Sequence, residues 1–395
     1  MISLPKIPEY NKEPWEIPLS ARVRAVSKAF ADGKKVALLC YRAADNSTFR
    51  YRCYNVMQAS QKSKEWAAVY FFQNEIEQLK VLLPQASLLV FTRVGWSIEL
   101  ESLAIFAKQK KIPVLFDVDD YVFNIDIVKL LANTLAVDLE IEENCNYWFS
   151  YIGRIQKMAS MAQGFITTNE YLGEKLQKKF GKEYCIIPNS LNEEQLAVSA
   201  MLAKQKAAQF SAKPFTIGYF SGTPSHENDF RECQGELVEF LKTYPDTRLL
   251  VVGFMTFSPE VEKLVEQGNI QRVPLVDFIE LQKLIAQVDV NIVPLINNSF
   301  TNCKSELKYF EAAAVDTITV ATPTYTYRKA IKHGENGYLC NPGQWYHTLE
   351  DIYLGKVDCT AVCAAAKQHA LVNYSGEKFL KQIEEAYGYL KNSLE

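Results

Sequence analysis

The sequence contains no apolar run long enough to cross a membrane. A spanning helix needs about 20 mostly apolar residues, and the best candidate, Val81–Phe91, is broken by Pro84 and Gln85. Met1–Ser20 holds four prolines and lacks the apolar stretch of a signal peptide. We therefore expect neither a membrane span nor a signal peptide.

Paired cysteines are also missing. The nine cysteines are an odd number, no two have CxxC spacing, and Cys359 and Cys363 are four residues apart with no histidine beside them. Disulfide frameworks and zinc sites usually show regular Cys or Cys/His spacing. The pattern predicts reduced thiols in a cytoplasmic protein and no metal site.

A strong net charge is absent too. The formal net charge is −3, so we expect no nucleic-acid partner, because such proteins usually present a basic surface. Two local basic clusters, Lys108–Lys111 and Lys175–Lys182, are typical of solvated helix ends. The alternative is peripheral contact with the anionic inner face of a membrane. With only four histidines, no Ser/His/Asp arrangement is predicted.

The length and the strand pattern predict a two-domain α/β protein. A chain of 395 residues with 48% hydrophobic content suits two domains. Apolar strands alternate with helical segments in both halves, which predicts two doubly wound parallel sheets. The strands of the first half are expected at Lys35–Tyr41, Trp66–Phe72, Ser87–Val94, Pro113–Phe116, Gly164–Thr168 and Tyr184–Pro188.

Domain boundaries follow from composition. Residues 193–213 are rich in Ala, Gln and Lys and have no strand pattern, so we place the interdomain connection there. The domains are then residues 1–192 and 214–374. Parallel sheets bind ligands at the carboxyl ends of their strands, so the ligand is expected in the cleft between the domains.

The segment 303–314 combines charges of both signs after an apolar strand, Val288–Leu295. We predict a helix that opens at Lys304 and carries Glu306, Lys308 and Glu311. Helix N-termini attract anions, a lysine adds a cation for phosphate, and a glutamate can accept hydrogen bonds from a sugar diol. The pattern favours a ligand with a diphosphate and a ribose; the alternative is a capped amphipathic helix with solvated charges.

The order of elements from residue 214 onward supports the first interpretation. With Glu311-Ala-Ala-Ala and His333-Gly-Glu-Asn-Gly-Tyr338, it resembles the donor-binding half of the GT-B glycosyltransferases, above all the retaining family four (glycosyl transferases group 1), over roughly residues 214–350. The resemblance implies two Rossmann-like domains facing across a cleft. It also implies sugar transfer from a nucleoside diphosphate sugar to a hydroxyl acceptor such as a growing glycan or polysaccharide, with retention and without a metal ion or other cofactor.

The resemblance also implies which residues contact the donor. Glu311 would accept hydrogen bonds from the ribose, and the base would lie against Arg272–Leu275. The expected donor set is Ser221, Gly222, Thr223, His226, Arg272, Val273, Leu275, Lys304, Glu306, Lys308 and Glu311.

Two departures from the family pattern leave a second hypothesis open. The family usually has two glutamates with seven residues between them, and this chain has Cys303 at the first position. The loop Ser221–Glu227 lacks the Arg and Lys that commonly hold the diphosphate, so Lys304 or Lys308 is expected to supply that charge. A non-catalytic module that binds a nucleotide sugar or a partner through a degenerate site is therefore the alternative.

A carboxylate cluster, Asp117-Val-Asp-Asp-Tyr121, follows a strand of the first half. It is open to interpretation as a metal-binding DxD motif, a phosphatase-like nucleophile at Asp117, a solvated cluster, or a carboxylate group in a GT-B acceptor domain. The two predicted doubly wound sheets in series favour the interpretation as a carboxylate group in a GT-B acceptor domain. Asp119 and Asp120, with Lys304, are then the catalytic candidates, because carboxylates there can stabilise positive charge at the anomeric carbon.

Acceptor contacts are expected at the same edge of the first sheet. Arginine forms planar, bidentate contacts with phosphate or carboxylate, which suits an acidic acceptor. The expected acceptor residues are Arg42, Arg50, Asp119 and Tyr121.

The last segment, residues 375–395, carries an apolar stripe at three- and four-residue steps. Phe379, Ile383 and Leu390 belong to it. We expect a helix that crosses back to the N-terminal domain.

Overall fold

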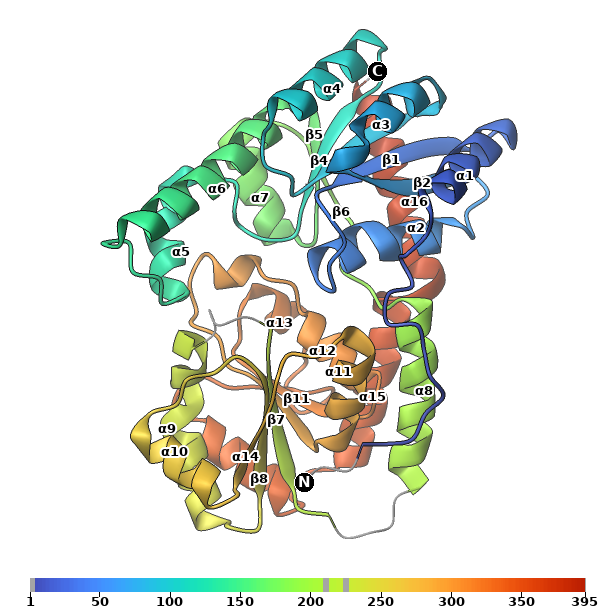
Figure 1. The fold of residues 1–395 in the computed structure, drawn as a ribbon. Helices are drawn as coiled ribbons and strands as arrows, with labels where there is room; N and C mark the ends of the chain where they lie inside the picture. Colours follow the sequence, from blue (N-terminus) through green and yellow to red (C-terminus); the bar gives the residue numbers. More distant parts are fainter. Residues whose placement is uncertain (1–3, 209–212, 223–226, 395) are drawn as a thin grey trace.

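The computed structural model describes residues 4–208, 213–222 and 227–394 of the chain. They form two α/β domains, one above the other in Figure 1, each built on a six-stranded parallel sheet. The strand orders are β2-β1-β3-β4-β5-β6 and β12-β11-β10-β7-β8-β9. The prediction of two doubly wound Rossmann-like domains is confirmed.

The N-terminal sheet contains the strands expected from the sequence, with small shifts at their ends. Its strands are β1 (Lys35–Tyr41), β2 (Trp66–Phe72), β3 (Leu88–Thr92), β4 (Val114–Val118), β5 (Gly164–Thr167) and β6 (Tyr184–Ile186). Its helices are α1 (Leu19–Ala31), α2 (Asn55–Ser60), α3 (Ile76–Leu82), α4 (Ile98–Gln109), α5 (Val128–Thr134), α6 (Glu142–Met161) and α7 (Glu170–Phe180).

The C-terminal sheet repeats this plan. Its strands are β7 (Thr216–Ser221), β8 (Arg248–Gly253), β9 (Ile270–Val273), β10 (Val290–Val293), β11 (Ile318–Ala321) and β12 (Tyr338–Leu339). The helices from residue 193 onward are α8 (Glu193–Ala208), α9 (Glu227–Thr243), α10 (Pro259–Glu266), α11 (Phe278–Gln287), α12 (Leu307–Ala313), α13 (Tyr325–Ala330), α14 (Trp345–Tyr353), α15 (Cys359–Asn373) and α16 (Gly376–Leu394).

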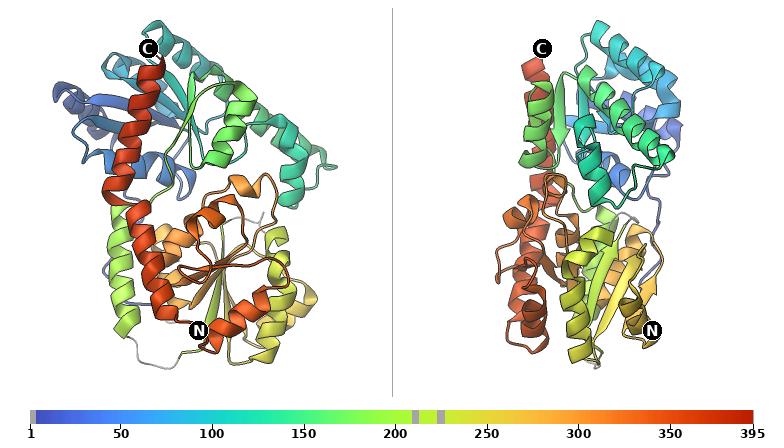
Figure 2. Two further views of the ribbon diagram at one scale, coloured as in Figure 1. Left: turned by 180° about the vertical axis from the view of Figure 1, so that it is seen from behind. Right: turned by 90° about the vertical axis from the view of Figure 1, so that its left-hand side faces the viewer.

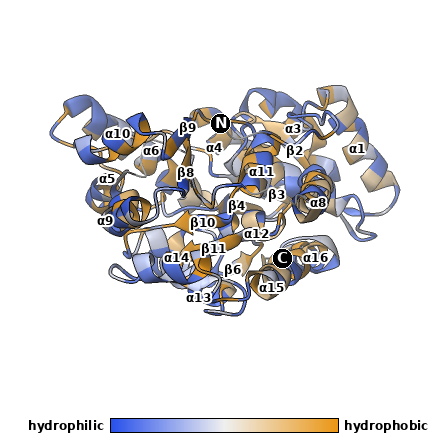
Figure 3. Cartoon of the chain, turned by 90° about the horizontal axis from the view of Figure 1, so that it is seen from below, coloured by the Kyte–Doolittle hydropathy of each residue, from blue (hydrophilic) through white to orange (hydrophobic). Residues whose placement is uncertain are grey.

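The strands form because they are apolar on both faces. In β1 every residue after Lys35 is buried, and all residues of β10 and β11 are buried. Parallel strands need such runs, since helices cover both faces of the sheet. Figure 3 shows β10 and β11 as hydrophobic strands among helices of mixed polarity.

The helix predicted at Lys304 begins one turn later. Lys304 has extended backbone angles (φ −68°, ψ 145°), Glu306 is the N-cap residue, and α12 starts at Leu307. The chain therefore enters α12 from an extended segment, so Lys304 precedes the helix and does not belong to its first turn.

Two neighbouring segments carry the chain between the domains. One is residues 189–192, which lead into α8, and the other is residues 374–376, between α15 and α16. They are joined by a hydrogen bond from the Leu191 amide to the Tyr374 carbonyl at 2.8 Å. Gly376 has a φ of +64°, which glycine adopts without strain and which separates α15 from α16.

Helix α16 packs on the N-terminal domain, as the rear view shows (Figure 2). Tyr387 packs against Trp66 of β2 with ring centroids 5.3 Å apart, and the Leu390 side chain lies over Gly164 of β5. The face that carries Phe379, Ile383 and Leu390 is buried. The C-terminus of the chain thus completes the core of the first domain.

The N-terminal residues form a third connection. The Lys6 carbonyl accepts a hydrogen bond from Gln205 of α8, and Lys12 pairs with Asp277 at the start of α11. Trp15 is buried between the domains, against Phe278 of α11 and Phe49. This segment ties α8 and α11 to the first domain.

Candidate active site

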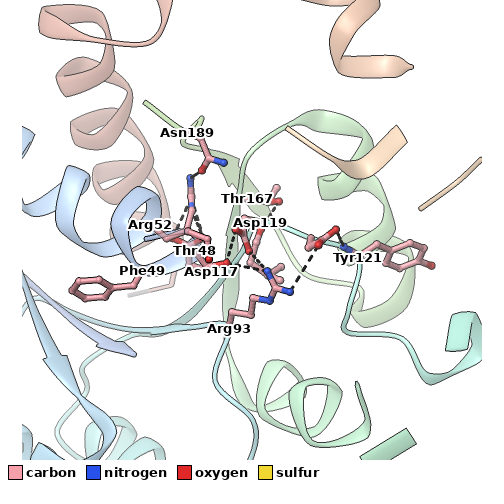
Figure 4. Close-up of polar contacts among 12 residues, drawn as sticks. Thr48, Phe49, Arg52, Arg93, Asp117, Asp119, Tyr121, Thr167 and Asn189 are labelled. Carbon is pink, nitrogen blue, oxygen red and sulfur yellow. Dashed lines mark hydrogen bonds and ion pairs between the residues drawn. The ribbon is translucent and has the colours of Figure 1, made fainter. Parts of the chain in front are cut away.

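The carboxyl end of the N-terminal sheet holds a buried ion pair. Arg52 donates to both carboxylate oxygens of Asp117, Nε to Oδ1 at 3.0 Å and Nη2 to Oδ2 at 3.1 Å, and its Nη1 donates to the Ile187 carbonyl (Figure 4). Burial raises the pKa of Asp117 to about 6, although Arg52 acts in the opposite direction. Because Asp117 is only 4% exposed, the structure argues against its interpretation as a phosphatase-like nucleophile.

Asp119 lies beside this pair in a more open cluster. Arg93 Nη1 donates to Asp119 Oδ1 at 3.0 Å, and the Thr48 hydroxyl donates to Oδ2 at 2.9 Å. The second guanidinium nitrogen of Arg93 is 3.8 Å from Asp120, and Nε is 3.3 Å from the Tyr151 hydroxyl. The cluster joins the ends of β3 and β4 to α6.

The second domain places Cys303 opposite this cluster. Burial raises the pKa of the Cys303 thiol, Asp120 raises it further, and Lys175 and Lys304 lower it. Asp120 of the first domain and Lys304 of the second are thus both near enough to Cys303 to affect the pKa of its thiol. The Cys303 carbonyl also accepts a hydrogen bond from Asn169 Nδ2 at 2.9 Å, which closes the gap between the domains here.

Lys304 and Lys308 are the cations at the carboxyl end of the second sheet. Lys304 Nζ lies 4.8 Å from the centre of the Phe300 ring, and Lys308 Nζ lies 5.5 Å from that of Tyr219 in β7. Burial lowers the pKa of Lys308 to about 8, and Asp229 partly offsets this effect. The Lys308 ammonium group is therefore beside β7, whose following loop was expected to bind a diphosphate.

The two glutamates, Glu306 and Glu311, are hydrogen-bonded to other residues of the protein. Glu306 shares a hydrogen bond with Tyr374, and burial raises the pKa of Glu306. The Glu311 carboxylate accepts hydrogen bonds from Tyr51, from Gln195 at 2.9 Å and from Arg50 at 3.3 Å. Glu311 is 2% exposed, so in this state it is bound by the protein itself.

The expected base-binding stretch is open. Leu275 is 54% exposed at the end of β9, and Phe254, at the end of the neighbouring strand β8, is 51% exposed. Arg272 is paired with Glu262 and stacks on Phe257 at 4.5 Å, and Val273 is partly buried. Backbone and apolar groups are thus the surface that β9 offers to a ligand.

The loop after β7 is described only in part. Ser221 is buried, Gly222 is exposed, and the Ser221 carbonyl lies so close to Gly253 that a Cβ there would be 1.7 Å from it. The predicted contacts Thr223 and His226 lie outside the described residues.

Two of the expected acceptor contacts, Arg50 and Tyr121, are buried in the protein. Arg50 is buried between Tyr51 and Phe278 and is bound to Glu311, because the turn that follows the first loop directs it into the second domain. Tyr121 is buried against Phe123. Arg42 is exposed at the surface.

The sequence analysis missed Thr48, Arg93 and Tyr151 as members of the site. Arg93 was placed inside a strand, whereas β3 ends at Thr92 and Arg93 has a φ of +45°. A charged residue at the carboxyl end of a buried strand is the signal that would have identified it.

Metal ligands do not converge in the part of the chain that the structure describes. Within residues 4–208, 213–222 and 227–394, no three His, Cys, Asp or Glu side chains are placed to hold an ion. Over the same residues, no helix is both long and apolar enough to span a membrane.

Comparison with known proteins identifies the second domain. Residues 220–353 match the family model described as Glycosyl transferases group 1. The chain therefore contains a domain that is similar to the group 1 glycosyltransferases. This agrees with the resemblance inferred from Glu311-Ala-Ala-Ala and the element order.

Solved GT-B structures share the whole fold. A glycosyltransferase from Rickettsia africae has a TM-score of 0.60 at 14% identity, covering 90% of this chain and 98% of its own. Anabaena HepE in complex with UDP and glucose has a TM-score of 0.57 at 14% identity, covering 90% and 100%. Sucrose-phosphate synthase from Thermosynechococcus elongatus has a TM-score of 0.56 at 14% identity, covering 91% and 100%.

One curated relative of this GT-B protein is the alpha-monoglucosyldiacylglycerol synthase of Acholeplasma laidlawii. It is 19% identical over 187 residues, which are 45% of this chain and 46% of the relative. The match thus spans about half the length of that relative.

Proposed function

We propose that this protein is a hexosyltransferase that moves a sugar from a nucleoside diphosphate sugar to a hydroxyl acceptor. The observation that carries the proposal is the presence of charged groups at the strand ends of both sheets. Asp119 and Asp120 end a strand of the first domain, and Lys304 and Lys308 lie at the carboxyl end of the second. The group 1 domain and the fold agree with this reading.

Each part of the cleft would have its own task. Lys304 and Lys308 would neutralise the diphosphate, whose charge grows as it leaves. Asp120 would stabilise positive charge at the anomeric carbon. Asp119, held by Thr48 and Arg93, would orient the acceptor hydroxyl.

For the donor and the acceptor we propose chemical classes and the first compounds to test. HepE was solved with UDP and glucose, so UDP-glucose is the first donor to try. A growing glycan or polysaccharide is the proposed acceptor; the synthase of Acholeplasma laidlawii, named for a glucosyl lipid, makes a lipid hydroxyl the second class to test. For a lipid acceptor, the protein would work at the inner face of the membrane as a peripheral protein.

We further propose a retaining, metal-independent reaction in the cytoplasm. The described residues present two lysines, and no convergent set of metal ligands, at the proposed diphosphate site. The nine cysteines are free thiols, which suits a reducing compartment. Unchanged turnover in EDTA and an NMR assignment of the product anomer would test the first two points.

A non-catalytic binding protein is the second candidate function. Two observations favour it: Cys303 replaces a carboxylate of the family pattern, and Glu311 is occupied by residues of the other domain. Such a protein would bind a nucleotide sugar without releasing nucleoside diphosphate.

Two measurements decide between these functions. A thermal-shift panel of UDP, GDP, ADP and CDP identifies the nucleotide, because a ligand that binds the folded state raises the Tm. Release of nucleoside diphosphate from the matching sugar donor then measures turnover. We expect Lys304→Ala to reduce turnover more than it weakens binding of the bare nucleoside. Binding without any release would favour the non-catalytic candidate.

A further inference from the structure

The turn Arg50–Tyr54 of the N-terminal domain makes contacts that have no role in the proposed sugar transfer. Residues Arg50–Tyr54 form a π-helical turn, with the Asn55 amide bonded to the Arg50 carbonyl, and all five side chains are buried. Such turns are rare and occur frequently at functional sites. Tyr54 donates to Glu194 at 2.7 Å, so the turn also contacts α8.

The same turn binds Glu311 of the second domain. Tyr51 donates its hydroxyl hydrogen to Glu311 Oε1, which also accepts from Arg50 and from Gln195 of α8. A further glutamine, Gln282 of α11, donates to the Glu311 carbonyl at 2.7 Å. Oε1 thus receives three hydrogen bonds from residues that lie outside its own helix.

The contact lies next to the segments that join the domains. Tyr51 packs in one apolar cluster with Leu191 and Tyr374, one from each crossing segment, and with Phe310 of α12. Rotation of the domains about these segments would therefore change the distance between Tyr51 and Glu311 while leaving each sheet intact.

Glu311 cannot serve Tyr51 and a ribose at once in this arrangement. A ribose diol needs one or both carboxylate oxygens, but Glu311 is 2% exposed and its Oε1 already accepts three hydrogen bonds. We infer that Tyr51 and the ribose of the donor compete for Glu311. In the empty protein Tyr51 holds the carboxylate and keeps the domains together; when the nucleotide binds, its diol replaces the tyrosine and the Arg50–Tyr54 turn moves away.

Replacing the Tyr51 hydrogen bond to Glu311 by one from the ribose should change the free energy little. Hydrogen bonds from hydroxyl groups to a carboxylate are similar in kind for a tyrosine and a ribose, so one replaces the other with little net change. Part of the nucleotide's binding free energy is used to shift the protein from the state in which Tyr51 binds Glu311 to the state in which the ribose does. The nucleotide therefore binds less tightly than its contacts alone would allow. This inference rests on the proposed function, since it takes the donor to be a nucleoside diphosphate sugar.

Removing one oxygen atom tests the competition. Tyr51→Phe removes the hydroxyl and keeps the ring in its apolar cluster. Tyr54→Phe is the matched control, because it removes a hydroxyl of the same turn that bonds to Glu194 and not to Glu311. Calorimetry would measure the Kd of UDP, or of the nucleoside diphosphate chosen by the panel, and of its 2′,3′-dideoxy form.

We expect Tyr51→Phe to tighten the natural nucleotide by about threefold to tenfold, the range that loss of one competing hydrogen bond allows. Tyr51→Phe should increase the affinity for the dideoxy nucleotide by a smaller factor. Tyr54→Phe should leave the affinities for both nucleotides unchanged. In a Glu311→Gln background the effect of Tyr51→Phe should be reduced. Unchanged or weaker binding by Tyr51→Phe, with a lowered Tm, would show a purely structural contact and overturn the inference.

Hydrogen exchange of the unmodified protein gives a second test that needs no variant. Nucleotide binding should increase exchange in peptides covering residues 49–55 while it protects the carboxyl end of the second sheet. Protection of both regions would contradict the exchange of partners. Absence of binding by every nucleoside diphosphate, to the natural protein and to Tyr51→Phe alike, would instead remove the proposed function, and the inference with it.

Discussion

Lys308 has a pKa of about 8 because it is partly buried beside Tyr219. A lysine is charged below its pKa, so its ammonium is present at pH 7 and is lost as the pH rises through 8. We therefore expect kcat/KM for the donor to fall above about pH 8, since this parameter reports groups of the free enzyme. A pH profile of nucleotide release would measure it.

Lys308→Arg provides the control for this pH profile. Arginine stays charged throughout the accessible pH range, so the alkaline decline should move upward or vanish even if the variant is less active. An unchanged decline in Lys308→Arg would assign it to another group.

The Arg52–Asp117 pair is a structural element of the first domain. Both side chains are almost completely buried, and breaking a buried pair leaves an uncompensated charge that costs about 3–5 kcal/mol. We expect Asp117→Asn to lower the free energy of unfolding by an amount of that order in urea titrations at pH 8, where Asp117 is ionised. Asp126→Asn, which breaks an exposed pair with Lys179, should cost less than about 1 kcal/mol.

At the scale of elements, the end of β9 is expected to recognise the base without its charged side chain. Arg272 is already engaged by Glu262 and Phe257, so we expect Leu275 and backbone groups to contact an incoming ring. Arg272→Ala should change the Kd of the nucleotide by less than about threefold, which is under 1 kcal/mol. A tenfold loss in calorimetry would show that the arginine itself reads the base.

At the scale of the whole molecule, helix α16 stabilises the first domain from the C-terminal end of the chain. Its buried face covers β2 and β5 of the first domain, while α15 packs on the second. Removing residues 375–395 should therefore expose apolar surface of the first domain and lower the Tm of the chain. A truncated chain that melts like the full one, in calorimetry, would exclude this role.

Neighbouring residues of α16 supply a matched pair of variants. Leu390 is fully buried over Gly164, whereas Tyr389 is 52% exposed. Leu390→Ala should cost about 2–5 kcal/mol of unfolding free energy, and Tyr389→Ala less than about 0.5 kcal/mol. Equal costs would mean that the helix is held by something other than its apolar face.

The sheets and the family motif were readable from the sequence because their signals are local. The strands β1 and β2 have the bounds expected from apolar runs, since burial on both faces requires such runs. The Glu311-Ala-Ala-Ala stretch identifies the group 1 domain for the same reason. Even a local signal can err by a turn, as at Lys304, where the extended backbone delays the helix to Leu307.

The partners of the charged side chains were decided only by the tertiary structure. Tyr51 and Glu311 are 260 positions apart, and Arg52 and Asp117 are 65 apart. No periodicity links such residues, because their meeting depends on how two sheets and the segments between them are placed. The sequence alone thus determined which residue types stand at the strand ends, and the placement of the domains determined that Glu311 is held by Tyr51 and that Asn169 is bonded to the Cys303 carbonyl.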